Sequence, residues 1–220
     1  KCRPYFVIFT AAMIKEACVE TFEEAVSAEK KGADRIELCA DLHLDGLTPS
    51  VELMQKTCAK LKIPVMVMIR PRGGDFVYSE EEISQMKSDI DKAKNAGVFG
   101  VVLGLLTKNN HIDVENTRLL AEYAQPLPVT FHKAIDLLAD PVEGAKTLAE
   151  IPGITRILTS GGKATAKDGS DVIRKMMDTV AGKVVILIAG KVTSENLNEI
   201  ENITGGTEFH GKKIVGNLTS

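Results

Sequence analysis

Two short segments in the first forty residues repeat the pattern glutamate, any residue, cysteine. The glutamates are Glu16 and Glu37, and the cysteines are Cys18 and Cys39. In a β-strand, side chains two residues apart point to the same face, so each glutamate would share a face with its cysteine. A buried carboxylate is costly unless it is paired. The two glutamates therefore indicate either a functional site or a structural ion pair, for example with Arg70.

The paired thiols would suit a soft metal ion. Thiolates are the preferred ligands of Cu(I) and also bind zinc. Two sulfurs do not complete a tetrahedral zinc site, whereas Cu(I) accepts few ligands. If Cys18 and Cys39 bind a metal, the sequence favours Cu(I). The alternative is that both are small core residues, since no CxxC motif occurs.

A cluster of arginine and glycine follows the apolar run at residues 65–69. It contains Arg70, Arg72, Gly73 and Gly74. Planar guanidinium groups and closely approachable backbone N–H groups are suited to an oxyanion or a phosphate. The same arginines could instead balance the buried glutamates, and the two roles are compatible.

Two further candidates occur where later apolar runs end. His132 is a candidate general acid or base, with Asp136 as a partner that would orient it. A purely structural histidine is the alternative. Ser160 and Gly161 begin a turn that precedes a helical segment, and their N–H groups would suit an anion.

Short segments rich in Val, Ile and Thr alternate along the chain with longer amphipathic segments. Their mean spacing of about 28 residues is the length of one βα unit. The predicted strands begin near Ala12, Asp34, Pro64, Phe99, Leu127, Ile154, Lys183 and Gly206. The predicted helices occupy residues 22–32, 48–60, 79–97, 113–124, 141–150, 166–181 and 193–203. Several strands are apolar throughout, as in parallel sheets covered on both faces.

This order predicts an α/β fold, a closed (β/α)8 TIM barrel. A doubly wound open sheet is disfavoured because no GxGxxG follows the first strand. Few residues follow His210, so we expect the eighth helix to be incomplete or missing. No linker is evident, and we expect one domain over residues 11–220, with residues 1–10 as a disordered or artificial leader. In such barrels, the residues at the carboxyl ends of the strands meet at one mouth.

Composition limits the partners. The chain has 220 residues, 44% hydrophobic and 26% charged, which is typical of a globular protein. A net charge of −3 and 5% aromatic residues without Trp disfavour a nucleic acid partner. The longest apolar run, at residues 5–14, is too short to cross a bilayer, so no membrane partner is expected. Four cysteines without CxxC predict a reducing compartment.

Five stretches of the chain read EACVET, GADRIELCADLHLDGLTPS, VMIRPRGGDFVYS, PVTFHKAID and LTSGGKATAKDG. Together they resemble the CutC family of copper homeostasis proteins, over about residues 16–211. The resemblance implies a TIM barrel, a cytoplasmic and in animals also nuclear location, a homo-oligomer, and Cu(I). By motif, Cys18 and Cys39 would be the copper ligands. The other matching mouth residues are Glu16, Glu37, Arg70, Arg72, His132 and Asp136.

Two stretches depart from the family pattern. AGKVT follows the seventh predicted strand, where the family tends to have a run of glycines, and FHGKKIVGNLTS replaces a continuation of the type FHGS-SAR. Both lie where the barrel closes and where a phosphate site would form.

Two functions of different classes follow. The predicted function is a copper homeostasis protein that binds Cu(I) through Cys18 and Cys39. The alternative is a TIM-barrel enzyme of unidentified reaction on a small anionic or phosphorylated metabolite. In that enzyme Arg70 and Arg72 would hold the anion, and His132 or a glutamate would move a proton. A scaffold role is compatible with the composition but explains none of these residues.

Overall fold

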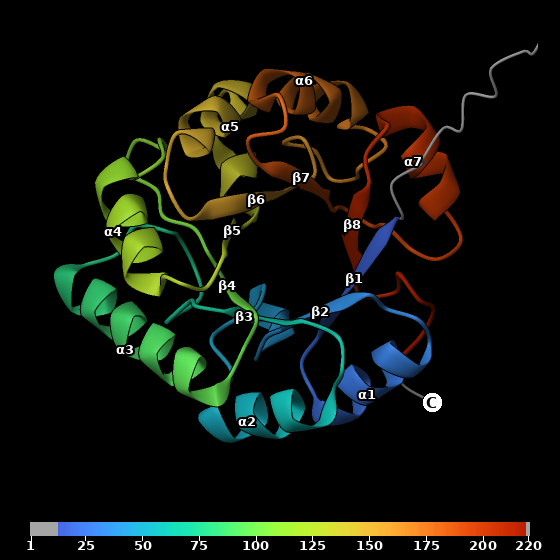
Figure 1. Ribbon diagram of the computed structural model, residues 1–220. Helices are drawn as coiled ribbons and strands as arrows, with labels where there is room; N and C mark the ends of the chain where they lie inside the picture. Colours follow the sequence, from blue (N-terminus) through green and yellow to red (C-terminus); the bar gives the residue numbers. More distant parts are fainter. Residues whose placement is uncertain (1–12, 219–220) are drawn as a thin grey trace, which may run out of the picture.

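The computed structural model describes residues 13–218, and its centre is a closed barrel of eight parallel strands in sequence order (Figure 1). This confirms the predicted fold class. The strands are β1 (Ile14–Val19), β2 (Arg35–Leu38), β3 (Val65–Met68), β4 (Gly100–Leu103), β5 (Val129–Phe131), β6 (Ile154–Thr159), β7 (Val185–Ile188) and β8 (Glu208–Gly211). The expected leader, residues 1–10, lies outside the described residues.

Helices surround the barrel and follow the predicted order (Figure 1). They are α1 (Phe22–Lys30), α2 (Val51–Lys60), α3 (Glu80–Ala96), α4 (Val114–Ala124), α5 (Pro141–Ala149), α6 (Ser170–Val180) and α7 (Leu197–Thr204). Two short 3-10 helices, η1 (Leu42–Leu44) and η2 (Lys133–Leu137), lie in the loops after β2 and β5. These loops carry several of the candidate residues.

The helix boundaries have local causes. Thr21 and Ser79 each cap a helix with a reciprocal capping box, in which a glutamate three residues later bonds back to the cap. Gly97 ends α3 in the left-handed conformation that glycine adopts without strain. These sequence signals set where the chain leaves each helix and enters the next strand.

The two faces of each strand have different surroundings. Outward-facing residues such as Ala17, Val19 and Ile36 belong to the large apolar core between barrel and helices. The inward face carries charged residues and, above them, a small cluster around Cys18 and Cys39. The expected shared face of each glutamate and its cysteine is therefore present.

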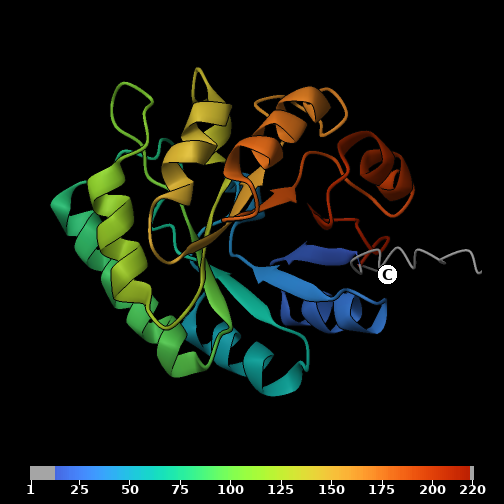
Figure 2. The ribbon, with the colours of Figure 1, turned by 45° about the horizontal axis from the view of Figure 1, so that its top comes forward.

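No eighth helix occurs among the described residues, yet the barrel closes. β8 pairs in parallel with β1, with Glu208 opposite Ile14 and His210 opposite Glu16. Figure 2 shows the two strands side by side beside the C-terminal segment, in which Ile214 is buried against the main core. Within residues 13–218, no helix has the length and apolarity needed to cross a membrane.

Candidate functional site

A cavity of about 590 Å³ opens at the carboxyl ends of the strands. Of the predicted site residues, those that line it are Cys18, Glu37, Cys39, Arg70, Gly74, His132, Asp136 and Ser160. The remaining predicted residues, Glu16, Arg72, Gly73 and Gly161, do not line it. The strand parities thus bring most of the candidate set to one mouth, as expected for this fold.

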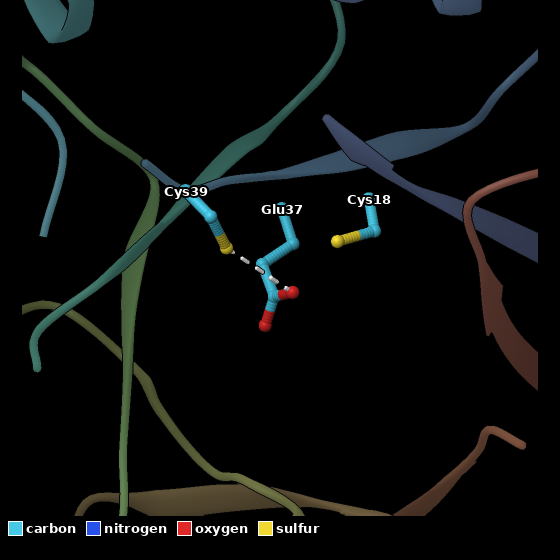
Figure 3. A group of neighbouring side chains, drawn as sticks. All are labelled: Cys18, Glu37 and Cys39. Carbon is cyan, nitrogen blue, oxygen red and sulfur yellow. Dashed lines mark hydrogen bonds between the residues drawn. The ribbon is translucent and has the colours of Figure 1, made fainter. Parts of the chain in front are cut away.

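The two thiols and Glu37 form a compact group at the base of the cavity (Figure 3). The sulfurs of Cys18 and Cys39 and a carboxylate oxygen of Glu37 all lie within 4.8 Å of one another. Cys18 is the register partner of Glu37 across β1 and β2, which fixes this approach. The Cys39 thiol donates to Glu37 Oε2 at 3.6 Å.

The two thiols differ in proton affinity. The hydrogen bond with Cys39 lowers the pKa of Cys18 well below its usual value. Burial opposes this decrease, and His210 and Glu37 add to it. The same contact, together with burial and the Glu37 charge, raises the pKa of Cys39 well above its usual value. Cys18 is therefore the thiol of the pair that ionises more readily, and Cys39 is the one that keeps its proton.

Glu37 holds a proton at neutral pH. Burial raises its pKa to about 8, against the opposing attraction of His210, and the negative charges of Cys18 and Glu16 add to the increase. Its Oε1 is buried and has no hydrogen-bond partner among the described residues. A buried polar atom without a partner marks a position where a ligand could bind.

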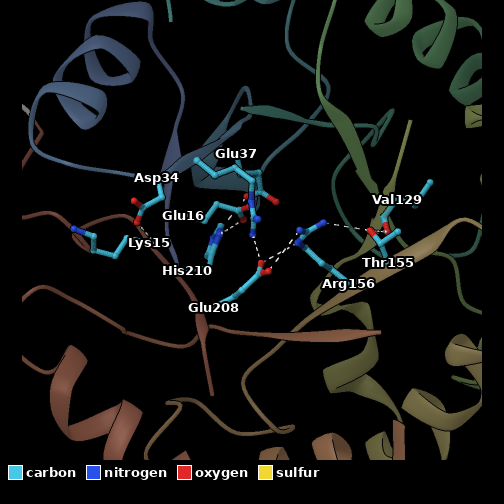
Figure 4. A network of polar contacts seen from close by, with 10 residues as sticks. Lys15, Glu16, Asp34, Glu37, Val129, Thr155, Arg156, Glu208 and His210 are labelled. Carbon is cyan, nitrogen blue, oxygen red and sulfur yellow. Dashed lines mark hydrogen bonds and ion pairs between the residues drawn. The ribbon is translucent and has the colours of Figure 1, made fainter. Parts of the chain in front are cut away.

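His210 connects the thiol group to a second, deeper layer (Figure 4). Its Nδ1 lies 2.9 Å from Glu16 Oε1, and its Nε2 lies 3.7 Å from Glu37 Oε2. Burial lowers the pKa of His210, but Glu37, Cys18 and Glu16 raise it well above its usual value. The imidazolium therefore balances the charge of the neighbouring thiolate.

The partner of Glu16 is Arg35 and not Arg70, which corrects the structural alternative raised from the sequence. Arg35 also donates to Glu208 at 2.6 Å, and Arg156 donates to Glu208 at 2.8 Å (Figure 4). Burial opposes ionisation of Glu16, but the bonds from His210 and Arg35 lower its pKa to about 2. Glu16 is a carboxylate that does not line the cavity but contacts His210, which does.

Arg70 lies in the cavity wall, but most of its N–H donors already bind backbone carbonyl groups of the neighbouring loops. Its Nη1 donates to the carbonyls of Leu44 and Gly46 at 2.8 and 3.1 Å, and its Nη2 donates to that of Gly74 at 3.0 Å. The guanidinium stacks on Phe76 at 4.8 Å. Only Nε has no partner among the described residues. Arg70 therefore shapes the loops of the mouth, and its Nε is left as a donor for a ligand.

Arg72 points away from the cavity, contrary to its expected role in anion binding. It pairs with Glu82 of α3, with Asp75 at 3.0 Å, and donates to the Val77 carbonyl at 2.7 Å. Gly73 lies against Leu44 and also does not line the cavity. The two arginines, two residues apart after the strand, face different partners because the chain turns directly after β3.

His132 is neutral, and Asp136 does not orient it. His132 Nδ1 accepts from the Ala134 N–H at 3.2 Å, so the neutral ring carries its proton on Nε2. Burial, helped by the positive charge of Arg70, lowers its pKa to about 3. Nε2 has no partner among the described residues. The expected histidine–aspartate pair is therefore wrong, since a backbone group takes the place of Asp136.

Asp136 instead fills the turn that was expected to bind an anion. Its carboxylate accepts from the N–H groups of Ser160 at 3.0 Å and Gly162 at 2.9 Å. Lys133 Nζ pairs with it at 2.8 Å and, despite burial, lowers its pKa. The Gly161 N–H donates to Thr159 Oγ1 at 2.9 Å. The turn is thus occupied by a side chain of the protein itself, which corrects the expected role of Ser160 and Gly161.

Comparison with known proteins decides the family. The family model described as the CutC family matches residues 13–215. The chain belongs to the CutC family. A human copper homeostasis protein cutC homolog is 46% identical over 197 residues, covering 90% of this chain and 72% of the relative. A CutC family protein of Pasteurella multocida is 40% identical over 195 residues, covering 89% of this chain and 80% of the relative.

Solved structures agree on the fold. The crystal structure of a CutC protein from Streptococcus agalactiae is 34% identical, with a TM-score of 0.87 that covers 92% of this chain and 99% of the other. A deoxyribose-phosphate aldolase from Coccidioides immitis has a TM-score of 0.67 at 13% identity, covering 99% of this chain and 87% of that one. At that identity the aldolase shares the barrel fold alone.

Sequence reasoning missed several residues of this CutC site. His210 lies near the end of β8 and shares its inward face with Glu208, two residues earlier, which repeats the spacing of Glu16 and Cys18. Arg35 and Glu37 are also two residues apart on one strand, so the sequence already indicated that they share a face. Lys163 and Lys212 are exposed residues that line the cavity at its rim, and neither makes an ion pair within residues 13–218. Both lysines lie in loops, where no two-residue strand period indicates which way a side chain points.

Proposed function

We propose that this CutC protein binds Cu(I) through Cys18 and Cys39 and acts in copper homeostasis. The observation that supports this most is the pair of buried sulfurs facing one cavity, in a group whose ligand atoms lie within 4.8 Å of one another. Thiolate is a soft ligand that selects Cu(I) over harder cations. The names of the relatives agree, because the human and mouse proteins are both called copper homeostasis proteins.

The protonation of the neighbours supports a soft ion with few ligands. At neutral pH Glu37 is protonated, and His210 is a cation. As a cation His210 has no lone pair for a metal, and a protonated carboxyl group such as that of Glu37 is a weaker ligand than a carboxylate. A tetrahedral zinc site needs four ligands, so two sulfurs alone do not complete it. The donor set therefore fits Cu(I) better than zinc.

A competition titration tests the proposal. The protein would be titrated with Cu(I) under reducing conditions against a coloured chelator such as bicinchoninate. We expect the Cys18→Ala/Cys39→Ala double variant to bind Cu(I) at least about tenfold more weakly than the unsubstituted protein. Cys58→Ala is the matched control, because Cys58 is a half-buried thiol on α2. Equal affinity in the double variant and the control would contradict the proposal.

A second candidate function is an enzyme acting on a small anionic metabolite. It is favoured by the cations and free donors that a copper site does not use. These are Arg70 Nε and His132 Nε2, which have no partner among the described residues, with Lys163 and Lys212 at the rim. A neutral imidazole N–H can polarise a carbonyl, and the lysines would hold a carboxylate or phosphate. These groups suit the binding of an anionic substrate and the polarisation of its carbonyl group.

A thermal-shift screen tests this second candidate. Phosphorylated and carboxylate metabolites would be added at millimolar concentration, and binding would raise the melting temperature. We expect a stabilising ligand to lose its effect in Lys163→Ala/Lys212→Ala. Lys146→Ala is the control, because Lys146 is exposed on α5. No stabilisation by any compound would remove the enzyme hypothesis and leave the copper proposal unaffected.

The family resemblance also implies self-association and a cytoplasmic, and in animals nuclear, location. Light scattering of the purified protein would give its mass in solution, and a monomer over the micromolar range would contradict self-association. Fractionation of cells that express the full-length protein would test the location.

A further inference from the structure

The thiols lie in a cluster that also contains methionine sulfur. Cys18, Cys39, Met66, Met68 and Val102 pack together on the inner face of the barrel. The interior of such barrels is usually filled by Val, Ile and Leu. Two methionines at consecutive inward positions of β3 place two thioethers beside two thiols.

Met68 and Cys39 lie in the same cluster, at corresponding places along β3 and β2. Glu37 pairs with Met66 and Leu38 with Val67, and Cys39 and Met68 are the residues that follow this last pair. Neighbouring strands lie about 4.8 Å apart, and side chains directly opposite each other on one face make contact. Met68 also lines the cavity together with both cysteines.

The other methionine of the cluster has different surroundings. Met66 is fully buried and does not line the cavity. Its end lies over Gly100 of β4, since a Cβ at Gly100 would be 2.6 Å from Met66 Cε and 2.9 Å from its sulfur. Met66 therefore fills the space that a glycine leaves, whereas Met68 faces the space that a ligand would occupy.

We infer that Met68 supplies the third ligand to the Cu(I) ion, so that the site is a three-sulfur centre of Cys18, Cys39 and Met68. This inference rests on the proposed copper function. A thioether is a soft ligand suited to Cu(I), and it carries no proton that must leave before it binds. Val102 belongs to the same cluster and Leu42 packs against it, so the sulfurs have apolar neighbours. Methionine is also an adaptable core filler, which is the role that the experiment must separate from ligation.

X-ray absorption spectroscopy of the Cu(I)-loaded protein counts the sulfur ligands directly. We expect three sulfur scatterers around copper in the unsubstituted protein and two in Met68→Leu. Met66→Leu is the matched control, with the same substitution in the same strand and cluster, and it should keep three. In competition titrations we expect Met68→Leu to bind Cu(I) about tenfold more weakly, within the range produced by the loss of one supporting group at metal sites.

The outcomes separate this inference from the proposed function. Two sulfur scatterers in the unsubstituted protein, or three that persist in Met68→Leu, would overturn the role of Met68 while Cu(I) binding through the cysteines stands. If the Cys18→Ala/Cys39→Ala variant keeps full affinity, the proposed function itself fails. If Met68→Leu folds poorly, two sulfurs in the unsubstituted protein would still overturn the inference, and three sulfurs that persist in Met66→Leu would still support Met68.

Discussion

His132 shows how a single buried side chain makes stability depend on pH. Its pKa is about 3 in the folded protein, against an ordinary value of 6.5, because burial and Arg70 disfavour the imidazolium. Between these values the unfolded chain binds a proton that the folded protein does not. The contribution of His132 to the free energy of unfolding therefore decreases as pH falls from 6.5 to about 3.

We predict that replacing His132 removes this slope. The unsubstituted protein should lose up to about 1.4 kcal/mol of unfolding free energy per pH unit below pH 6.5 relative to His132→Gln. Urea denaturation at several pH values between 4 and 7 would measure the difference. His43→Gln is the control, since the His43 side chain is 72% exposed. Parallel stability curves for the protein and His132→Gln would contradict the prediction.

Gly104 makes room for the ring of His132. A Cβ at Gly104 would lie 2.4 Å from two atoms of that ring, which is closer than atoms can pack. We predict that Gly104→Ala lowers the free energy of unfolding by about 1–3 kcal/mol, the usual cost of overpacking a core. Gly73→Ala should cost less, because its Cβ would meet Leu44 at an ordinary 3.6 Å. Chemical denaturation compares the two, and equal stabilities would show that the ring can move aside.

At the scale of elements, Asp136 joins η2 to the loop between β6 and α6. It accepts hydrogen bonds from Ser160 and Gly162 in that loop, and from Thr159 and Lys133. A buried carboxylate with several donors holds two loops of the mouth in one arrangement. The position of η2 relative to β6 therefore depends on this one side chain.

We predict that Asp136→Ala destabilises the protein by at least about 2 kcal/mol, because buried N–H groups lose their acceptor. Asp140→Ala, which removes only the cap of α5, should cost about 1 kcal/mol. Denaturation curves would give both values. Inorganic phosphate should raise the melting temperature of Asp136→Ala more than that of the unsubstituted protein, because the freed N–H groups suit an anion. No difference in either measurement would show that the loop is held by other contacts.

At the scale of the whole molecule, a charge network spans the point where the barrel closes. Arg35 of β2 binds Glu16 of β1 and Glu208 of β8, and Arg156 of β6 binds Glu208 as well. These strands close the barrel without an eighth helix in the described residues. The network ties the first strands of the chain to the last.

We predict that Arg35→Met lowers the free energy of unfolding by about 3 kcal/mol, because two buried carboxylates each lose one cationic partner. Glu16 keeps His210, and Glu208 keeps Arg156. Lys146→Met is the control, since it removes an exposed ion pair with Glu143 and should cost less than about 1 kcal/mol. Urea denaturation at neutral pH measures both. A cost below 1 kcal/mol for Arg35→Met would mean that other groups compensate the carboxylates.

The sequence alone determined the barrel and the shared face of each glutamate and cysteine. These follow from the length of βα units and the two-residue period of strands, which are local properties. Which groups meet was decided by the tertiary structure. The register of β1 with β2 and β8 places Glu16 beside Arg35 and His210. The loop after β3 directs Arg72 to Glu82, away from the cavity. The loop after β5 places Asp136 in the turn at Ser160. Partner choice depends on contacts between segments far apart in the chain, and local spacing does not encode them.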